Sequence, residues 1–248
     1  ESCGVDRIFL DLEILGKEAR QGHLDTVISN HSLEDLKNLN DKINIAKIIT
    51  RINPLNKDSE AEINEVIGIG TDIIMLPMFK TADEVKKFIK FVGGRAKVSI
   101  LLETAPAIVR IDSIMNVKGI DEVHIGLNDL HLDLGVSFMF ELFTSGLIDF
   151  IVNKLASKKI SYGIGGVATS SGGIINGSDV IKEYARLGSE CVILSRSFKD
   201  LSNQKNFKRE LDLILREYKN YGDLSYKIKV KYQQELYNLI NQVQKSKA

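Results

Sequence analysis

The stretch 97-KVSILLETAPAIVRIDSIMNVKGIDEVHIGLNDLHLDLG-135 contains two short apolar runs, and each of them ends near an acidic residue. The first run leads to Glu103 and the second to Asp129. Both runs are almost continuously apolar, which is typical of parallel strands that are buried on both faces of a sheet. The stretch therefore predicts two buried parallel strands, each with a carboxylate where it ends.

Five further runs of the same kind extend this pattern along the chain. Together, the runs that predict strands are 8-IFLDLE-13, 45-IAKIITRIN-53, 72-DIIMLP-77, 97-KVSILLE-103, 122-EVHIGL-127, 161-SYGIGG-166 and 191-CVILSR-196. Segments between them have apolar residues at helical spacing, and several end on glycine, as helices commonly do; they include 59–70, 81–94 and 179–188. Thr81 and Glu84 also predict a capping box.

The alternation of strands and helices predicts right-handed β-α-β units and a parallel sheet. An open doubly wound sheet and a closed (β/α)₈ TIM barrel both have this pattern. A barrel uses about 250 residues and eight strands, whereas seven runs are visible, and residues 1–7 resemble the end of a helix capped near Gly4. We therefore expect an α/β protein with a TIM barrel over residues 1–202 that lacks its first strand. We hypothesise that this strand lies upstream of Glu1.

The tail, residues 203–248, has no strand pattern. Its apolar residues recur at helical spacing and predict one or two amphipathic helices; they are Leu224, Ile228, Tyr232, Leu236, Leu239, Ile240 and Val243. These helices are expected to pack on the barrel. Alternatively, because exposed apolar stripes often mark interfaces, they contact a neighbouring subunit of a homo-oligomer.

The composition argues against several classes of partner. Lysine plus arginine and aspartate plus glutamate both total 33, so the charge balance gives no reason to expect nucleic acid or a membrane surface as a partner. Cys3 and Cys191 are the only cysteines, which argues against a disulfide framework and for a reducing compartment. The sequence has no run of about 18 apolar residues and no signal-peptide pattern, so we expect a cytoplasmic protein.

Polar residues at the predicted strand ends are candidates for a functional site, because all strands of a parallel barrel end at the face where active sites form. They are Asp11, Glu13, Arg51, Glu103 and Asp129. Two carboxylates suit a hard divalent cation, Mg²⁺ or Mn²⁺. A lone acid at such a place is more often a solvated loop residue or a helix cap, and Asp129 has the position of a cap. Arg51 offers a bidentate fork to a carboxylate or an enolate oxygen, or pairs with a neighbouring acid.

Several segments together resemble a known family. The stretch 101–135 has an acid–Thr pair, a Gly-Ile-Asp step, the motif Ile-Gly-Leu-Asn-Asp-Leu and a closing Leu-Gly. In this it resembles the HpcH/HpaI aldolase and citrate lyase beta-subunit family. The segments 10-LDLE-13, 50-TRINPLN-56 and 70-GTDIIMLPMFKTADEV-85 resemble the family's early acidic strand, its arginine strand and its Met-Leu-Pro strand. The resemblance covers most of residues 8–200.

The resemblance implies a TIM barrel of the phosphoenolpyruvate/pyruvate superfamily that makes or breaks carbon–carbon bonds. It implies that Glu103 and Asp129 bind the divalent metal, and that Arg51 stabilises the enolate of a 2-oxo acid or an acyl thioester. Metal and arginine would both neutralise the charge that develops on the enolate oxygen. Relatives of this architecture commonly assemble as homo-oligomers.

The chain departs from the family after its early acidic strand. Ile14 follows Glu13, whereas the pyruvate aldolase branch has a histidine that takes part in base catalysis and the citrate lyase branch has an acid. His23, and less readily His31, could supply the missing base; the alternative is a solvated loop histidine. The segment 17-KEAR-20 resembles a group of the citrate lyase branch, and its Lys17 and Arg20 would grip an acidic group of the substrate or pair with neighbouring acids.

The glycine-rich stretch 163-GIGGVATSSGG-173 supports a second hypothesis. It follows the penultimate strand, where many barrels hold phosphate on backbone N–H groups, and Gly166 and Ser195 are the candidate binding residues. The protein would then be a phosphate-binding isomerase or synthase. A flexible closing loop is the alternative for this stretch. A non-catalytic barrel is a third possibility, which Ile14 supports best.

Overall fold

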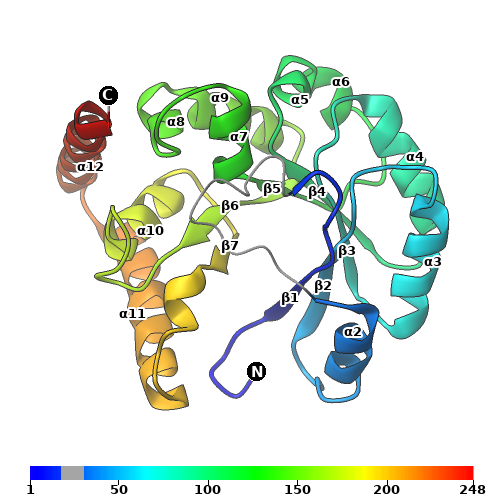
Figure 1. Cartoon of the computed structure of the whole chain (residues 1–248). Helices are drawn as coiled ribbons and strands as arrows, with labels where there is room; N and C mark the ends of the chain where they lie inside the picture. The colour runs from blue at the N-terminus through cyan, green and yellow to red at the C-terminus, as the bar shows by residue number, and fades with distance from the viewer. Residues whose placement is uncertain (18–30, 248) are drawn as a thin grey trace. The chain divides into compact units, whose positions relative to one another are not determined.

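The computed structural model describes residues 1–17 and 31–247 and divides them into two compact units (Figure 1). Unit one comprises Glu1–His124 with Lys158–Ser161, and unit two comprises Ile125–Ser157 with Tyr162–Ala248. The strand runs of the sequence all form strands, and in the sheet they follow one another in chain order from β1 to β7. A doubly wound sheet would reverse its strand order part-way along, so the sequential order is that of a (β/α) barrel.

Unit one contains the first strands, which pair in parallel. They are β1 (Arg7–Asp11), β2 (Lys47–Arg51), β3 (Ile73–Leu76) and β4 (Lys97–Leu102). Strand β5 (Glu122–Ile125) follows at the end of the unit, and its last residue belongs to unit two. The helices of unit one are α2 (Leu33–Asn40), α3 (Ser59–Ile69), α4 (Ala82–Val92), α5 (Ala105–Val109) and α6 (Ile111–Met115). One face of the strands forms an apolar layer of Ile49, Ile73, Met75 and Leu101, against which Phe9 packs.

Helix α4 begins and ends as its sequence predicts. The Thr81 hydroxyl accepts a hydrogen bond from the N–H of Glu84, and the Glu84 carboxylate accepts one from the N–H of Thr81. Gly93 ends the helix in the left-handed conformation, at φ 59°. The predicted helices 59–70 and 179–188 are also present, as α3 and as part of α10. Residues 1–4 form a turn closed by Gly4, where the sequence suggests the end of a helix.

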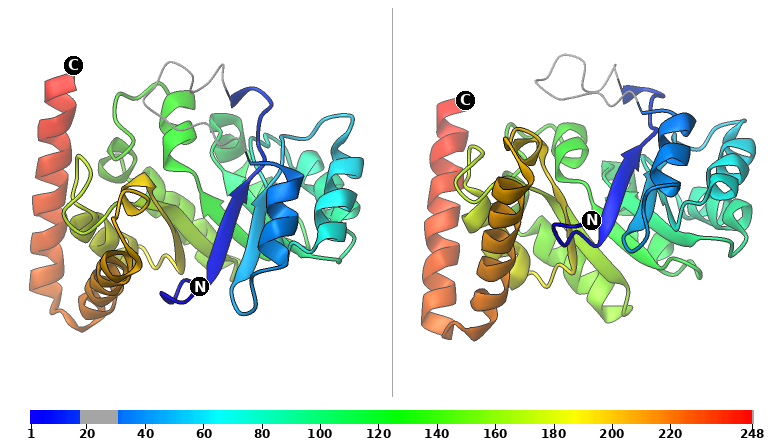
Figure 2. Two further views of the ribbon diagram at one scale, coloured as in Figure 1. Left: turned by 60° about the horizontal axis from the view of Figure 1, so that its bottom comes forward. Right: turned by 90° about the horizontal axis from the view of Figure 1, so that it is seen from below.

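Unit two contains the last strands and the C-terminal helices. Strands β6 (Ser161–Val167, whose first residue belongs to unit one) and β7 (Cys191–Leu194) pair in parallel, with an irregularity between Gly163 and Gly166. The helices are α7 (Leu127–Asp133), α8 (Glu141–Thr144), α9 (Leu147–Ser157), α10 (Gly177–Arg186), the 3₁₀ turn η1 (Arg196–Phe198), α11 (Gln204–Asp223) and α12 (Tyr226–Lys247). The predicted helical tail is thus two helices, which Figure 2 shows in orange and red.

Within unit two the C-terminal helices pack on the helices that precede them. Helix α11 contacts α10, and α12 contacts both α8 and α10. Leu236 and Ile240 of α12 are buried there, whereas Ile228, near the start of the same helix, is exposed. The predicted packing on the chain's own helices is therefore present; the subunit contact stays a prediction. In the described part of the chain, no helix is both long and apolar enough to cross a membrane.

Candidate active site

Strands β1 and β2 pair in parallel and end at the same level, so that two candidate residues lie together. Asp11 and Arg51 are directly opposite each other across the two strands. The guanidinium of Arg51 donates from Nε to Asp11 Oδ1 at 2.9 Å and from Nη2 to Asp11 Oδ2 at 2.8 Å. This is the fork geometry in which arginine binds a carboxylate most firmly. The sequence left open whether Arg51 pairs with an acid, and it does.

Two more charged side chains join this pair. The ammonium of Lys17 donates to Asp11 Oδ2 and lies 4.0 Å from Glu13 Oε2. Glu13 Oε2 also lies 3.5 Å from Nε of Arg51. Glu13, Lys17 and Asp11 are all buried. The N–H of Glu13 donates to Asp11 Oδ1 at 3.2 Å, which holds the turn that carries them.

Asp11 and Arg51 are both ionised, because the charge of each stabilises the charge of the other. Burial alone would raise the pKa of Asp11, but the hydrogen bonds and positive charges of Arg51 and Lys17 outweigh burial and lower this pKa to about 2. Burial would likewise lower the pKa of Arg51, but the hydrogen bond to Asp11 and the negative charges of Asp11, Glu13 and Glu103 raise it. Asp11 and Arg51 therefore remain charged at every pH at which the protein is expected to work.

Glu103 is buried directly after β4, where the sequence predicts it. Its Oε1 accepts a hydrogen bond from the N–H of Met78 at 3.1 Å. Its charge acts on Arg51, so it belongs to the same group of side chains. We call Asp11, Glu13, Lys17, Arg51 and Glu103 the strand-end cluster. Three acids face two cations in it, so with every side chain ionised the cluster carries one net negative charge.

Asp129 lies in unit two, and its surroundings differ from the prediction in one respect. It is buried, but it lies in the first turn of α7 and not at the end of β5. Gly126, not Asp129, holds the N-cap position of that helix. The helix-cap alternative for Asp129 is therefore wrong.

The donor chemistry of Glu103 and Asp129 fits a divalent cation. Both supply hard carboxylate oxygens from buried positions, and Mg²⁺ typically binds one or two protein carboxylates and keeps several waters. No group of three or more histidine, cysteine, aspartate or glutamate side chains suited to a metal ion occurs among the residues that the structure describes.

The remaining catalytic candidates are placed as follows. His23 and Arg20 lie outside the described residues, so their predicted roles stay predictions. His31 accepts a hydrogen bond at Nδ1 from the N–H of Asp11, at 3.4 Å, which brings it to the edge of the strand-end cluster. Ile14 is exposed; the N–H groups of Ile14 and Leu15 both donate to the Asn53 side chain at 2.9 Å.

The glycine-rich stretch 163–173 begins within β6 and continues into a folded turn after Val167. The N–H and the hydroxyl of Ser170 both donate to Oε2 of Glu210 on α11, at 2.9 and 2.8 Å. The N–H of Thr169 donates to the hydroxyl of Ser197, at 2.9 Å. A carboxylate of the chain itself therefore occupies the place that an anion would take at Ser170.

The two binding residues proposed for this second hypothesis lie in unit two. Gly166 is exposed, and its carbonyl accepts a hydrogen bond from the Tyr184 hydroxyl at 3.0 Å. The hydroxyl of Ser195 lies 3.1 Å from that of Ser197. Both residues are thus part of a network of bonds within the chain.

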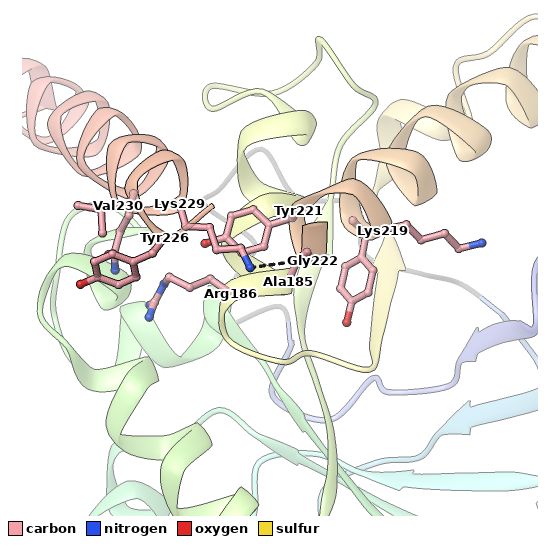
Figure 3. A pocket seen from close by; sticks show the side chains of 10 residues that line it. Ala185, Arg186, Lys219, Tyr221, Gly222, Tyr226, Lys229 and Val230 are labelled. Carbon is pink, nitrogen blue, oxygen red and sulfur yellow. Dashed lines mark hydrogen bonds between the residues drawn. The ribbon is translucent and has the colours of Figure 1, made fainter. Parts of the chain in front are cut away.

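A groove of about 540 Å³ lies elsewhere in unit two, between α10, α11 and α12 (Figure 3). Two of its charged lining residues, Arg186 and Lys229, have partners within the chain. Arg186 is held by Asp149 at 2.7 Å and by Glu183 at 2.8 Å, and Lys229 donates to the carbonyl of Gly222 at 2.9 Å. The groove contains none of the candidate residues, so it is not the candidate site.

Sequence reasoning missed the residues that act on the cluster through the main chain or through a second layer. Met78 contributes an N–H, which any residue except proline has, so its side chain carries no signal. Thr104 donates its hydroxyl to the carbonyl of Phe79 at 2.8 Å; it is the threonine of the acid–Thr pair, whose role the motif alone did not reveal. Asn53 lies two residues after Arg51, and this short distance in sequence could have indicated that Asn53 lies near the cluster.

Comparison with known proteins indicates the family of the chain. The family model of HpcH/HpaI aldolase/citrate lyase matches residues 3–141. No match was found among curated proteins. Two similar solved structures are an HpcH/HpaI aldolase from Desulfitobacterium hafniense DCB-2 (TM-score 0.60, 16% identity, 78% of each chain covered) and an HpcH/HpaI aldolase/citrate lyase family protein from Burkholderia cenocepacia J2315 (TM-score 0.60, 12% identity, 77% of this chain and 79% of that one).

At these sequence identities the two solved structures show a shared fold. The family model covers more than half of the chain and therefore shows the family. The chain belongs to the HpcH/HpaI aldolase/citrate lyase family.

Proposed function

We propose that the protein is a divalent-metal-dependent carbon–carbon lyase that acts on a 2-oxo acid, or on a related carboxylated substrate such as an acyl thioester, through an enolate. The observation that carries the proposal is the strand-end cluster, in which an oriented arginine lies beside an excess of buried carboxylates. Membership of a family of aldolases and lyases supports it.

Arg51 is the residue that would stabilise the enolate. Asp11 occupies its Nε and Nη2 donors, which fixes the plane of the guanidinium, and the Nη1 side would bind the anionic substrate. A donor that is already oriented stabilises developing charge without reorganising during the reaction. Asp11 itself, with a pKa of about 2, is a poor base near neutral pH, and its role is to hold Arg51 and Lys17.

Glu103 and Asp129 would hold Mg²⁺ or Mn²⁺, and the bound ion would act as a Lewis acid toward the substrate oxygen. In the cleavage direction a base takes the proton of a hydroxyl group, the carbon–carbon bond breaks, a carbonyl forms and the electron pair remains on the enolate. A proton then returns to the enolate carbon. Lys17 and Arg20 would grip a carboxylate of the substrate, and Glu13 and His23 are the candidates for proton transfer.

The phosphate-binding isomerase is the weaker alternative, because Glu210 already accepts the bonds of Ser170 that a phosphate would need. The non-catalytic barrel remains the third hypothesis. It predicts tight binding of a 2-oxo acid without turnover. We further propose that the protein is a cytoplasmic homo-oligomer whose partner is a small-molecule substrate and not a nucleic acid or a membrane.

Exchange of the pyruvate methyl protons with deuterium, followed by NMR, tests the proposal. We expect exchange that requires Mn²⁺ or Mg²⁺ and that falls about 100-fold or more in Glu103→Gln and in Asp129→Asn, since each removes charge from the site. Asp83→Asn is the matched control, because Asp83 is an exposed acid on α4; it should leave the rate unchanged.

The folded state of each variant is checked by circular dichroism. A metal-dependent exchange rate that is the same in Glu103→Gln as in wild type would contradict the assignment of this site. Wild-type protein that is folded and binds pyruvate but exchanges no protons would favour the non-catalytic hypothesis.

A further inference from the structure

Met78, directly after β3, has a backbone conformation that its residue type disfavours. Its φ is 55°, in the left-handed region, where the Cβ of an L-residue crowds the following carbonyl. Among the described residues, the other non-glycine with a positive φ is Lys159. In this conformation the N–H of Met78 points at Glu103 and donates to Oε1 at 3.1 Å.

The surrounding structure holds the turn in this conformation. The hydroxyl of Thr104, next to Glu103, donates to the carbonyl of Phe79, next to Met78, at 2.8 Å. The turns after β3 and β4 are thus joined by two bonds in opposite directions. Phe79 is buried and Thr104 caps α5 by accepting from the N–H of Ala107, so neither turn can shift alone.

Strained residues persist where their surroundings over-determine the backbone, and they concentrate at functional sites. A carboxylate whose one oxygen is bound by a fixed N–H cannot rotate freely about its last bond. For a carboxylate that binds a metal, such a partner sets the direction of the other oxygen and the basicity of both. The positive φ of Met78 therefore indicates a function of its main chain, which the type of its side chain does not suggest.

We propose that the strained turn at Met78 positions the Glu103 carboxylate for a divalent cation, through its main-chain N–H and at the expense of local stability. This inference rests on the proposed function, because it takes Glu103 to be a metal ligand. Met78 is a positioning residue, and its side chain is not required for the role.

The test measures Mn²⁺ binding to the full chain by electron paramagnetic resonance, together with the thermal midpoint, in wild type, Met78→Gly and Lys159→Gly. Glycine adopts a positive φ without strain, so both variants relieve the same conformation. Lys159 lies between α9 and β6, where the chain enters a strand, and so serves as the matched control.

We expect Met78→Gly to keep the wild-type Kd for Mn²⁺ without a lower thermal midpoint, because glycine keeps the N–H that binds Glu103 and adopts the positive φ without strain. Lys159→Gly should keep the wild-type Kd. A rise of about tenfold in the Kd for Mn²⁺ in Met78→Gly would show that the Met78 side chain is required, and would overturn the inference.

A second variant removes the hydrogen bond alone. Replacement of Met78 by its α-hydroxy analogue makes a backbone ester that keeps the side chain but has no N–H to donate. We expect the Kd for Mn²⁺ to rise about tenfold or more in the ester variant, the range of effects seen when a partner of a metal ligand is lost. Wild-type Mn²⁺ affinity in the ester variant would overturn the inference and leave the proposed function standing. Folded wild type that binds no Mn²⁺ would overturn both.

Discussion

Asp11 is the residue on which the charged groups of the site depend, because it bonds to two buried cations at once. We expect Asp11→Asn to lower the free energy of unfolding by about 3 kcal/mol at pH 7, the lower end of the cost of leaving buried partners unpaired. The pKa of Asp11 is lowered to about 2, so its contribution is fully present above the ordinary value near 4 and is lost as the pH falls through 2. Urea unfolding from pH 7 to pH 2 measures this.

The pH dependence separates the charge of Asp11 from its packing. About 2 kcal/mol of the difference between wild type and Asp11→Asn should disappear between pH 5 and pH 2, from a lowering of the pKa of about 2 units. Asp83→Asn, at an exposed surface pair, should follow wild type throughout. Parallel curves for wild type and Asp11→Asn across this range would show that the charge of Asp11 does not stabilise the fold.

At the residue scale, the sequence predicted which side chains gather but not what each contacts. Asp11, Glu13, Arg51 and Glu103 all follow apolar runs, and the parallel register brings them together as expected. Whether Arg51 pairs with an acid depends on side-chain rotamers, which periodicity does not report. The hydrogen bond from Met78 to Glu103 could not be predicted, because every residue except proline has a main-chain N–H.

At the scale of elements, the contact between α11 and the turn after β6 makes a further prediction. Glu210→Ala removes both bonds that hold Ser170. We expect a loss of about 2 kcal/mol of stability, as for a hydrogen bond to a charged group. Hydrogen exchange, measured by mass spectrometry, should become faster at residues 168–177.

Asp212→Ala is the control for this prediction, since Asp212 lies on the same helix and forms an exposed pair with Lys208 at 3.2 Å. Equal exchange at residues 168–177 in wild type and Glu210→Ala would show that α11 does not hold the turn. The same variant also probes the alternative function: binding of inorganic phosphate by Glu210→Ala, but not by wild type, would show that Glu210 takes the place of an anion.

Elements were predictable where a single physical pattern dominates. Continuous apolar runs identified the strands, and the capping box identified the start of α4. Asp129 was misplaced because α7 starts as soon as β5 ends, with Gly126 as its N-cap, so that no loop separates the strand from the helix. The contact between Glu210 and the turn after β6 could not be predicted, because Glu210 is distant from Ser170 in sequence.

At the scale of the whole molecule, the two compact units allow a prediction about α12. Removal of residues 226–248 exposes the surfaces on α8 and α10 against which Leu236 and Ile240 are buried. We expect a loss of about 3 to 6 kcal/mol, from about 1.5 to 3 kcal/mol for each buried aliphatic side chain. Hydrogen exchange should rise in α8 and α10, whereas β1 to β4 of unit one should keep their protection.

Ile228→Ala is the control here, because Ile228 is on α12 but exposed, and it should change neither unit. An equal rise of exchange in β1 to β4 on removal of α12 would show that the two units unfold as one. The sequence could not reveal this division, since strands and helices alternate across it without a change in composition. It did indicate the barrel class, which the sequential strand order then separated from a doubly wound sheet.

The hydrogen bond from Met78 to Glu103 has an evolutionary consequence. Selection on this contact acts on the path of the backbone and not on the side chain at position 78, where any residue that tolerates a positive φ keeps the donor and proline removes it. Glu103, in contrast, is tied to one chemistry. A lineage can therefore lose all resemblance at position 78 while inheriting the contact unchanged, so identity between homologues would understate how faithfully this part of the site is passed on.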